Sequence, residues 1–301
     1  MPAALAHDAV RGDAVQNTVL AAADWRERAA AHQERADALT ADHRARRARN
    51  ERHAIEDFLF EYYSTKPGRL RRWHPGIGVA LADADEHAGW RWYGTDGAVT
   101  ALDLGAFRSE RGEAAGHIRR LLAATAGRSA VLGCFGMHEW AMVYRASDAG
   151  RRHGLPLRLG GDGTDAVVES HPLQCTHFDA FRFFTAEAAP RNAHALTRAG
   201  QVDSEQPGCL HATMDLYKWS LKLEPAVPGE LVLDCFELAR DVRRVDMQAS
   251  PYDVSSYGLA AIPVETAAGK SEYARRQRDF AARVAPLRQR LIDICDQILA
   301  A

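Results

Sequence analysis

The stretch CLHATMDLYKWSLKL, residues 209–223, decides the fold class. Its apolar residues return at helical spacing and no proline interrupts them, so the segment predicts a helix. The same reasoning predicts helices over 14–63, 229–244 and 109–126. A long apolar stripe predicts a closing helix over 270–300, formed by Tyr273, Phe280, Val284, Leu287, Leu291, Ile294 and Ile298.

Between these helices the chain shows weaker signals for strands and turns. Residues 79–107 alternate weakly and predict a small antiparallel hairpin with its turn near Gly94–Gly97, in which Trp90 and Trp92 would share one face. We interpret 146–168 as turns between short strands, and expect a helix near 191–199 and a short strand at 261–266. The sequence thus predicts a single helix-rich α+β domain with a small antiparallel sheet.

The N-terminal part differs in composition from the rest. We expect residues 1–13 to be a disordered tail, 14–52 to form a helical arm, and 53–301 to form a helix-rich catalytic domain. The arm carries much arginine and few large apolar side chains. It would therefore pack loosely or serve an interface, for example in a homodimer.

Composition narrows the class of protein. The 301 residues are 47% hydrophobic and 26% charged, with a formal net charge of −2, which is ordinary for a soluble globular chain and argues against a dedicated duplex-DNA binder. A local basic patch for nucleic acid stays open. The five cysteines are odd in number and include no CxxC pair, which argues against a disulfide framework. No signal peptide or membrane-spanning run is evident, so we expect a cytoplasmic protein without membrane contact.

The densest set of chemically useful side chains lies in SHPLQCTHFDAFRFFT, residues 170–185. If this segment is a strand, His177 and Asp179 point the same way. If it is a helix, His171, Cys175 and Asp179 share a face and His177 turns away from Asp179. Both conformations are compatible with the sequence.

Two further segments supply candidate ligands. His211 and Asp215 are four residues apart on the expected 209–223 helix, so they share a face. Residues 137–140, MHEW, begin like a HExxH zinc motif but lack its second histidine. Our leading hypothesis is an enzyme with a divalent metal, iron or zinc, held by His177, Asp179 and His211, with Glu139 or Asp215 as base or orienting group.

The substrate of such an enzyme would be a flat or anionic small molecule. It would lie against Phe178, Phe181 and Trp73, steered by Arg71 or Arg182. Oxygenases that use an H-x-D ligand pair are many-stranded jelly rolls, whereas this chain is mostly helical. A third possibility is a non-catalytic ligand-binding protein in which the histidines are hydrogen-bonded core residues.

Several longer phrases carry a resemblance. Together they resemble a group of bacterial proteins of similar length, usually named 3-methyladenine DNA glycosylase. The phrases are DFLFEYY (57–63), RRWHPG (71–76), GCFGMHEWAMVYR (133–145), SHPLQCTHFDAFRFFT (170–185), EQPGCLHATMDLYKW (205–219) and ASPYD (249–253). The resemblance covers roughly residues 50–285. It implies an N-glycosylase acting on DNA or a nucleobase. Such an enzyme needs no metal, and our own hypothesis is that Asp179 or Asp215 would stabilise positive charge on the sugar or activate water.

Overall fold

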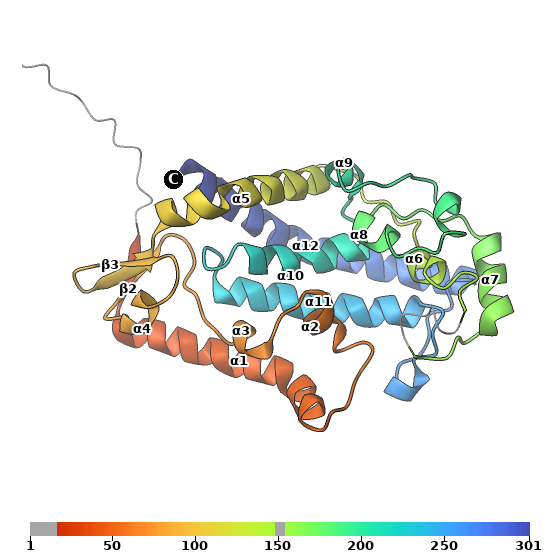
Figure 1. Cartoon of the computed structure of the whole chain (residues 1–301), viewed down its shortest axis with the longest axis horizontal. Helices are drawn as coiled ribbons and strands as arrows, with labels where there is room; N and C mark the ends of the chain where they lie inside the picture. Colours follow the sequence, from red (N-terminus) through yellow and green to blue (C-terminus); the bar gives the residue numbers. More distant parts are fainter. Residues whose placement is uncertain (1–16, 148–153) are drawn as a thin grey trace, which may run out of the picture.

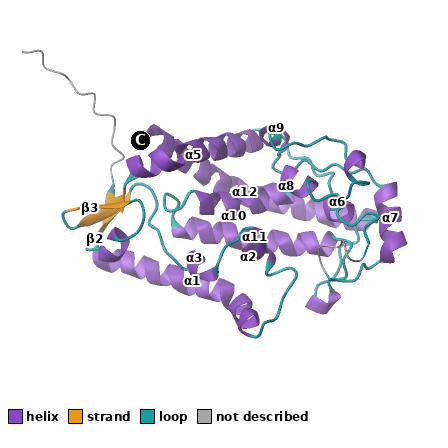
Figure 2. Cartoon of the chain, viewed as in Figure 1, coloured by secondary structure: helices purple, strands orange, loops and turns teal. Residues whose placement is uncertain are grey.

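The computed structural model describes residues 17–147 and 154–301. The tail expected at 1–13 lies outside this range. Twelve α-helices, two 3₁₀ helices and four strands are present in the described residues (Figures 1 and 2). This confirms the helix-rich α+β class.

The elements follow one another along the whole chain. The longer helices are α1 (Ala22–Ala48), α5 (Leu104–Ala126), α7 (Gly160–Ser170), α10 (Leu210–Lys222), α11 (Gly229–Ala249) and α12 (Ala267–Ala300). The short ones are α2 (Phe58–Tyr62), α3 (Pro67–Leu70), α4 (Asp85–Ala88), α6 (Met137–Ala141), α8 (Phe178–Phe181), α9 (Gln201–Ser204), η2 (Ala189–Arg191) and η3 (Ser255–Tyr257). The strands are β1 (Thr18–Leu20), β2 (Val79–Ala82), β3 (Tyr93–Asp96) and β4 (Val99–Leu102).

Helix α10 forms the centre of the molecule. All of its residues are buried except Lys218 and Lys222, so most of the helix surface is enclosed, as expected for a core helix. It packs against α11 and α12, and α12 in turn packs against α5 (Figure 1). The helices expected over 209–223, 229–244, 270–300 and 109–126 are therefore confirmed, and Pro286 is accommodated within α12.

The sheet lies at one end of the helical assembly (Figure 2). Its strand order is β1-β2-β4-β3, with β4 antiparallel to both of its neighbours. The expected hairpin is confirmed, since β3 and β4 are joined by a two-residue loop that contains Gly97 with a φ of 58°. Two features differ from expectation. First, β1 pairs with β2 in parallel. Second, β3 begins only at Tyr93, so Trp90 and Trp92 precede the strand, and Trp92 has a left-handed φ of 64°.

Helix α1 is more firmly attached than an arm of its composition suggests. Trp25, His32, Ala36 and Thr40 are buried. The Trp25 indole donates a hydrogen bond to the Ala82 carbonyl of β2 at 2.8 Å. Ion pairs from Arg28 and Arg35 to α11 add further contacts. The loose packing expected for this arm is therefore not observed, although its division from the rest of the chain stays a prediction.

Over 14–63 we expected one long helix or two helices in line, and the described residues form neither. Helix α1 ends at Ala48, Asn50 adopts a left-handed φ of 55°, and the chain turns back to α2 (Figure 1). The Phe60 ring of α2 then lies 5.6 Å from that of Phe236 on α11. Tertiary packing of these aromatic side chains thus outweighs the helical propensity of the segment between them.

Four local predictions were wrong. The region interpreted as turns between strands contains α7, the helix near 191–199 is mostly loop, and 261–266 forms no strand. The stretch 171–184 is neither a strand nor one helix, but a loop followed by α8. His177 terminates this loop, because its Nδ1 accepts a hydrogen bond from the Ala180 amide and so caps α8.

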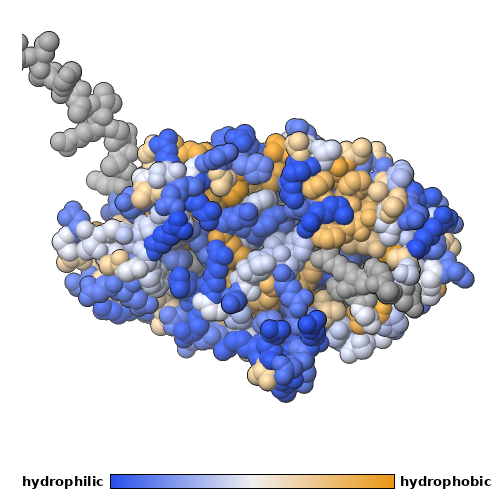
Figure 3. Space-filling model, viewed as in Figure 1, coloured by the Kyte–Doolittle hydropathy of each residue, from blue (hydrophilic) through white to orange (hydrophobic). Residues whose placement is uncertain are grey.

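None of the helices in the described residues is both long and apolar enough to cross a membrane. The five cysteines are free, in agreement with the absence of a disulfide framework expected from the sequence. The face in Figure 3 is largely hydrophilic, and its apolar side chains gather towards the upper right, where α6 and α8 lie in Figure 1.

Candidate metal centre

Two groups of histidines and carboxylates meet near the N-terminal end of α10. The first, which we term the His211 group, consists of His138, His211 and Asp246. The second, the His177 group, consists of His177, Glu205 and Asp215. All six residues are buried, and within each group the candidate ligand atoms lie within 4.8 Å of one another. Each group could therefore hold a metal ion.

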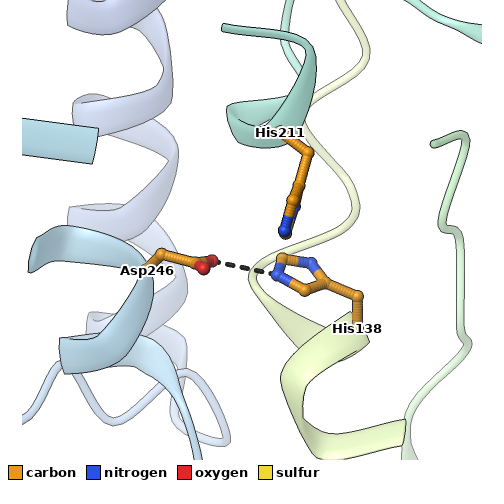
Figure 4. Close-up of side chains that lie close together, drawn as sticks. All are labelled: His138, His211 and Asp246. Carbon is orange, nitrogen blue, oxygen red and sulfur yellow. Dashed lines mark hydrogen bonds and ion pairs between the residues drawn. The ribbon is translucent and has the colours of Figure 1, made fainter. Parts of the chain in front are cut away.

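The His211 group is assembled from three helices. His138 comes from α6, His211 from the first turn of α10 and Asp246 from the last turns of α11. His138 Nε2 lies 2.9 Å from Asp246 Oδ1, and the rings of His138 and His211 are 4.4 Å apart and nearly perpendicular. Figure 4 shows a ring nitrogen of His211 directed at the space beside the His138–Asp246 pair. Two imidazoles and one carboxylate thus converge on one point.

His211 is unusual among these side chains. Its ring nitrogens make no hydrogen bond to any residue in the described part of the chain, although only 8% of the residue is exposed. Burial, together with the neighbouring His138, lowers the pKa of His211 well below its ordinary value. His211 is therefore neutral at physiological pH, which is the form in which imidazole binds metals.

The carboxylate of Asp246 is held from its other side. Arg243 donates from Nη1 to Asp246 Oδ2 at 2.9 Å and to Glu139 Oε1 at 2.7 Å. Burial alone would lower the pKa of His138, but the Asp246 carboxylate outweighs it and keeps that pKa well above its ordinary value. The pair thus shares a proton at a position where a cation could replace it.

The His177 group is more completely satisfied by protein atoms. His177 Nε2 lies 3.3 Å from Asp215 Oδ2 and 3.3 Å from Glu205 Oε1. The other oxygen of Asp215 accepts a hydrogen bond from the Tyr63 hydroxyl at 2.9 Å, and the Lys218 ammonium contacts the same carboxylate. Asp215 therefore already has a cationic partner.

Electrostatics reinforce this difference. Burial alone would raise the pKa of Asp215, but Lys218 and His177 bring it far below its ordinary value, so Asp215 is ionised. Burial raises the pKa of Glu205. His177 Nδ1 accepts a hydrogen bond from the Ala180 amide. The proton of a neutral His177 must therefore be on Nε2, which faces the carboxylates of Glu205 and Asp215. This arrangement suits proton exchange better than metal ligation.

The two groups adjoin each other and a cleft. The rings of His177 and His211 are 5.3 Å apart. On the opposite side of Asp215, Tyr63 and Lys218 line a cleft of about 630 Å³, here termed the Lys218 cleft, whose wall also includes Tyr62, Asp179, Arg182 and Lys222. A chain of contacts thus runs from this cleft through Asp215 and His177 to the His211 group.

The expected metal ligands are close together but divided between the groups. His177 and His211 converge, as predicted, yet each belongs to its own group. Asp179 instead forms ion pairs with Arg198 at 2.6 Å and Lys218 at 3.2 Å. The cause is the cap on α8, which places Asp179 in the first helical turn with its carboxylate towards the cleft. The set His177, Asp179 and His211 is therefore not the one that the structure brings together.

The expected substrate-binding residues are dispersed. Trp73 is buried beside Trp25 and Leu81, and Arg71 is ion-paired with Asp37 on α1. These two lie on the side of the molecule near α1 and the sheet. Phe178 and Phe181 pack against a small cluster of buried residues formed by Met142, Cys175, Ala180 and Leu196. Of the expected set, Arg182 alone lines the Lys218 cleft.

Sequence reasoning missed Asp246, Arg243, Glu205 and Tyr63. Asp246 and Arg243 lie three residues apart on α11, where an arginine-rich helix resembles a solvated surface. The sequence did contain a signal for these two residues. In VRRVD, residues 242–246, each of them follows a valine, and all five residues except Arg244 lie on the buried face of α11. Glu205 lies in the loop before α10, where no periodicity shows which way it faces.

No protein-family model matches the chain, no curated protein matches it, and no solved structure matches it.

Proposed function

We propose that the protein is a metal-dependent enzyme whose single divalent ion is bound by His138, His211 and Asp246. Two imidazoles and one carboxylate are a ligand set used by both non-haem iron and catalytic zinc, and both leave coordination positions open for water or substrate. The one observation that carries this proposal is His211: a buried, neutral imidazole whose ring nitrogens make no hydrogen bond in the described residues, and which is directed at the space beside the His138–Asp246 pair.

The surrounding residues have defined tasks in this proposal. Arg243 and Glu139 orient Asp246, so Glu139 acts through Arg243 and not as a base. Such an orienting ion pair commonly supports metal ligands. A bound ion would act as a Lewis acid and lower the pKa of a water molecule at the site. Iron would direct this site towards oxidation and zinc towards hydrolysis.

The His177 group would donate and accept protons during the reaction. Its hydrogen bonds connect Tyr63 at the cleft to His177, which faces His211. Since Asp215 stays ionised, its task is to hold the protonated Nε2 of His177 and the Lys218 ammonium, and the exchangeable proton resides on His177 or Glu205. A proton on His177 or Glu205 is thereby held beside the metal centre.

The Lys218 cleft would bind the substrate. Arg182, Arg198, Lys218 and Lys222 line it. Asp179 and Glu61, which also line it, and Asp215, which pairs with Lys218, neutralise part of this charge. Tyr62, Tyr63 and Trp219 add aromatic surface. An anionic small molecule with an apolar or flat portion matches this lining.

Metal content after purification without added metal tests the proposal. We expect about one equivalent of iron or zinc in the wild-type protein, and loss of most of it in His211→Ala and in His138→Gln, because three-ligand sites rarely survive removal of one ligand. His171→Ala is the matched control, since His171 lies outside both groups and bonds the Val167 carbonyl of α7. Thermal unfolding of each variant separates loss of metal from loss of fold.

A wild-type protein that stays metal-free after incubation with iron and zinc would contradict the proposal. Retention of metal in both His211 group variants would also contradict it. In the first case the two groups would be buried hydrogen-bond networks, which stabilise a core without binding metals.

A second candidate is a metal-free N-glycosylase, which the sequence resemblance implies. The observation in its favour is the Lys218 cleft, where Asp179 stands beside aromatic and cationic side chains that a base and a phosphate require. Release of free base from methylated DNA by the metal-free protein, abolished in Asp179→Asn, would support it over the first proposal.

A further inference from the structure

A second cleft lies apart from the His211 group. It encloses about 740 Å³ between α3, the chain before β3, and α5, and we term it the Trp90 cleft. Its wall carries five cations, Lys66, Arg69, Arg72, Arg91 and Arg111. Glu224 is the acidic residue of this wall, although the whole chain has a net charge of −2. The positive charge of this cleft is therefore a local feature.

Three of these cations lack an acidic partner. Arg69 is paired with Glu224 at 2.8 Å, and Arg91 is paired with Glu110. Lys66, Arg72 and Arg111 form no ion pair within the described chain. Three unpaired cations on one concave surface repel one another, so an anion that reaches all of them gains more than it would at an open surface.

Tryptophans hold two of these cations in place. The Arg72 guanidinium lies 5.2 Å from the ring centre of Trp90, and that of Arg111 lies 5.7 Å from the ring centre of Trp92. A guanidinium stacked on an aromatic ring keeps its in-plane N–H groups free for bidentate hydrogen bonds to phosphate. Both rings line the cleft and both are half-buried, and the Arg91 guanidinium also lies over Trp92, 4.2 Å from the ring centre.

The backbone of this cleft is strained. Ser64 and Trp92 both line it and both have left-handed φ values, 50° and 64°. For a bulky residue such as tryptophan this conformation is a genuine outlier, and such outliers gather where ligands bind. Trp92 is fixed there by its indole, which donates to Glu110 at 3.1 Å, and by its edge contact with Phe107 at 5.1 Å.

We infer that the Trp90 cleft binds a nucleoside phosphate, with the phosphates at Lys66, Arg72 and Arg111 and the base against Trp90 and Trp92. The volume suits a molecule of this size, since ligand pockets span roughly 300–1,000 Å³. The two clefts share Ser64 in their linings, so a ligand here would sit beside the cleft that we assign to the substrate.

Quenching of tryptophan fluorescence by ADP tests this inference. We expect saturable binding to the wild-type protein, weakened at least about tenfold in Arg72→Ala/Arg111→Ala and in Lys66→Ala/Arg72→Ala. Arg278→Ala on α12 is the matched control, because it removes an exposed arginine that lines neither cleft. His211→Ala should bind ADP as the wild type does, so failure of the metal site and failure of this inference are distinguishable.

Three companion ligands define the class. Adenosine and pyrophosphate should each bind at least about tenfold more weakly than ADP, because each provides only half of the contacts. Pyrophosphate binding as tight as that of ADP would overturn the inference and indicate a bare anion site. Binding of a single-stranded oligonucleotide about tenfold tighter than ADP would overturn it in favour of a nucleic-acid site. Unchanged ADP affinity in both double variants, or no saturable ADP binding, would also overturn it.

Discussion

The clearest signal at the scale of single residues is a histidine without a partner. Most buried polar atoms in proteins are hydrogen-bonded, and the His177 group follows that rule closely. The ring nitrogens of His211 make no hydrogen bond in the described residues, and they lie where a carboxylate and a second imidazole converge. The contrast between the two groups explains why we assign the metal to one and proton exchange to the other.

His74 gives a pH dependence of stability at the same scale. Burial lowers its pKa to about 3, with His87 and Arg72 adding to the effect. The folded state therefore binds this proton less well than the unfolded state, in which the pKa is near 6.5, so the stability is complete above pH 6.5 and falls as the pH drops towards 3. One such group contributes a slope of ~1.4 kcal/mol per pH unit.

Urea unfolding of wild-type protein and His74→Gln measures this slope. Between pH 6.5 and pH 5 the wild type should lose ~2 kcal/mol more stability than the variant, because glutamine does not titrate. If the free energy of unfolding changes with pH equally in the two proteins, the pKa of His74 is the same in the folded and unfolded states, and the prediction is wrong.

The residues of the site were only partly predictable. His177, His211 and Asp215 could be found from their types and spacing, because α10 is a regular helix and its sequence shows it. Asp246 could not be paired with His138 in this way, since 107 residues separate them and only the packing of α6 on α11 joins them. Ligand sets assembled from separate helices depend on tertiary contacts that spacing does not encode.

At the scale of elements, local capping decides where several segments begin. His177 ends a loop and caps α8, which turns Asp179 into the cleft and separates it from the expected ligand set. Both alternatives considered for 171–184 assumed regular structure throughout and therefore missed this cap. The long amphipathic helices were predictable because their apolar periodicity extends over many turns, whereas four-residue helices have no such period.

Helix α5 offers a test of capping. Asp103 Oδ1 accepts a hydrogen bond from the Ala106 amide at 2.8 Å and forms the N-cap. Asp103→Ala should lower the free energy of unfolding by about 1 kcal/mol, because one amide of the first turn loses its partner. Asp96→Ala, in an exposed position of β3, is the control and should change it by less than about 0.5 kcal/mol. Equal effects of the two variants would argue against the cap.

At the scale of the whole molecule, α1 joins the sheet to the helical core. Trp25 is buried against Leu81 and Ala84, and its indole donates a hydrogen bond to the Ala82 carbonyl of β2. Ion pairs from Arg28 and Arg35 then connect α1 to α11. Composition alone suggested a loosely attached arm, because it does not show that α1 buries Trp25, His32, Ala36 and Thr40 against the rest of the chain.

Replacement of Trp25 tests this attachment. Trp25→Ala should lower the free energy of unfolding by about 3–5 kcal/mol, since a large buried ring and its hydrogen bond are both lost. Glu27→Ala, an exposed change two residues further along the same helix, should leave stability within about 0.5 kcal/mol of the wild type. A folded and equally stable protein lacking residues 1–45 would show instead that α1 is dispensable.

The account as a whole depends on a metal ion among His138, His211 and Asp246. Anomalous X-ray scattering from a crystal of the purified protein, recorded at the iron and zinc absorption edges, tests this most directly. We predict one peak, about 2.0–2.2 Å from a nitrogen of each histidine and an oxygen of Asp246. A peak in the His177 group, or no peak from protein incubated with both metals, would contradict the account.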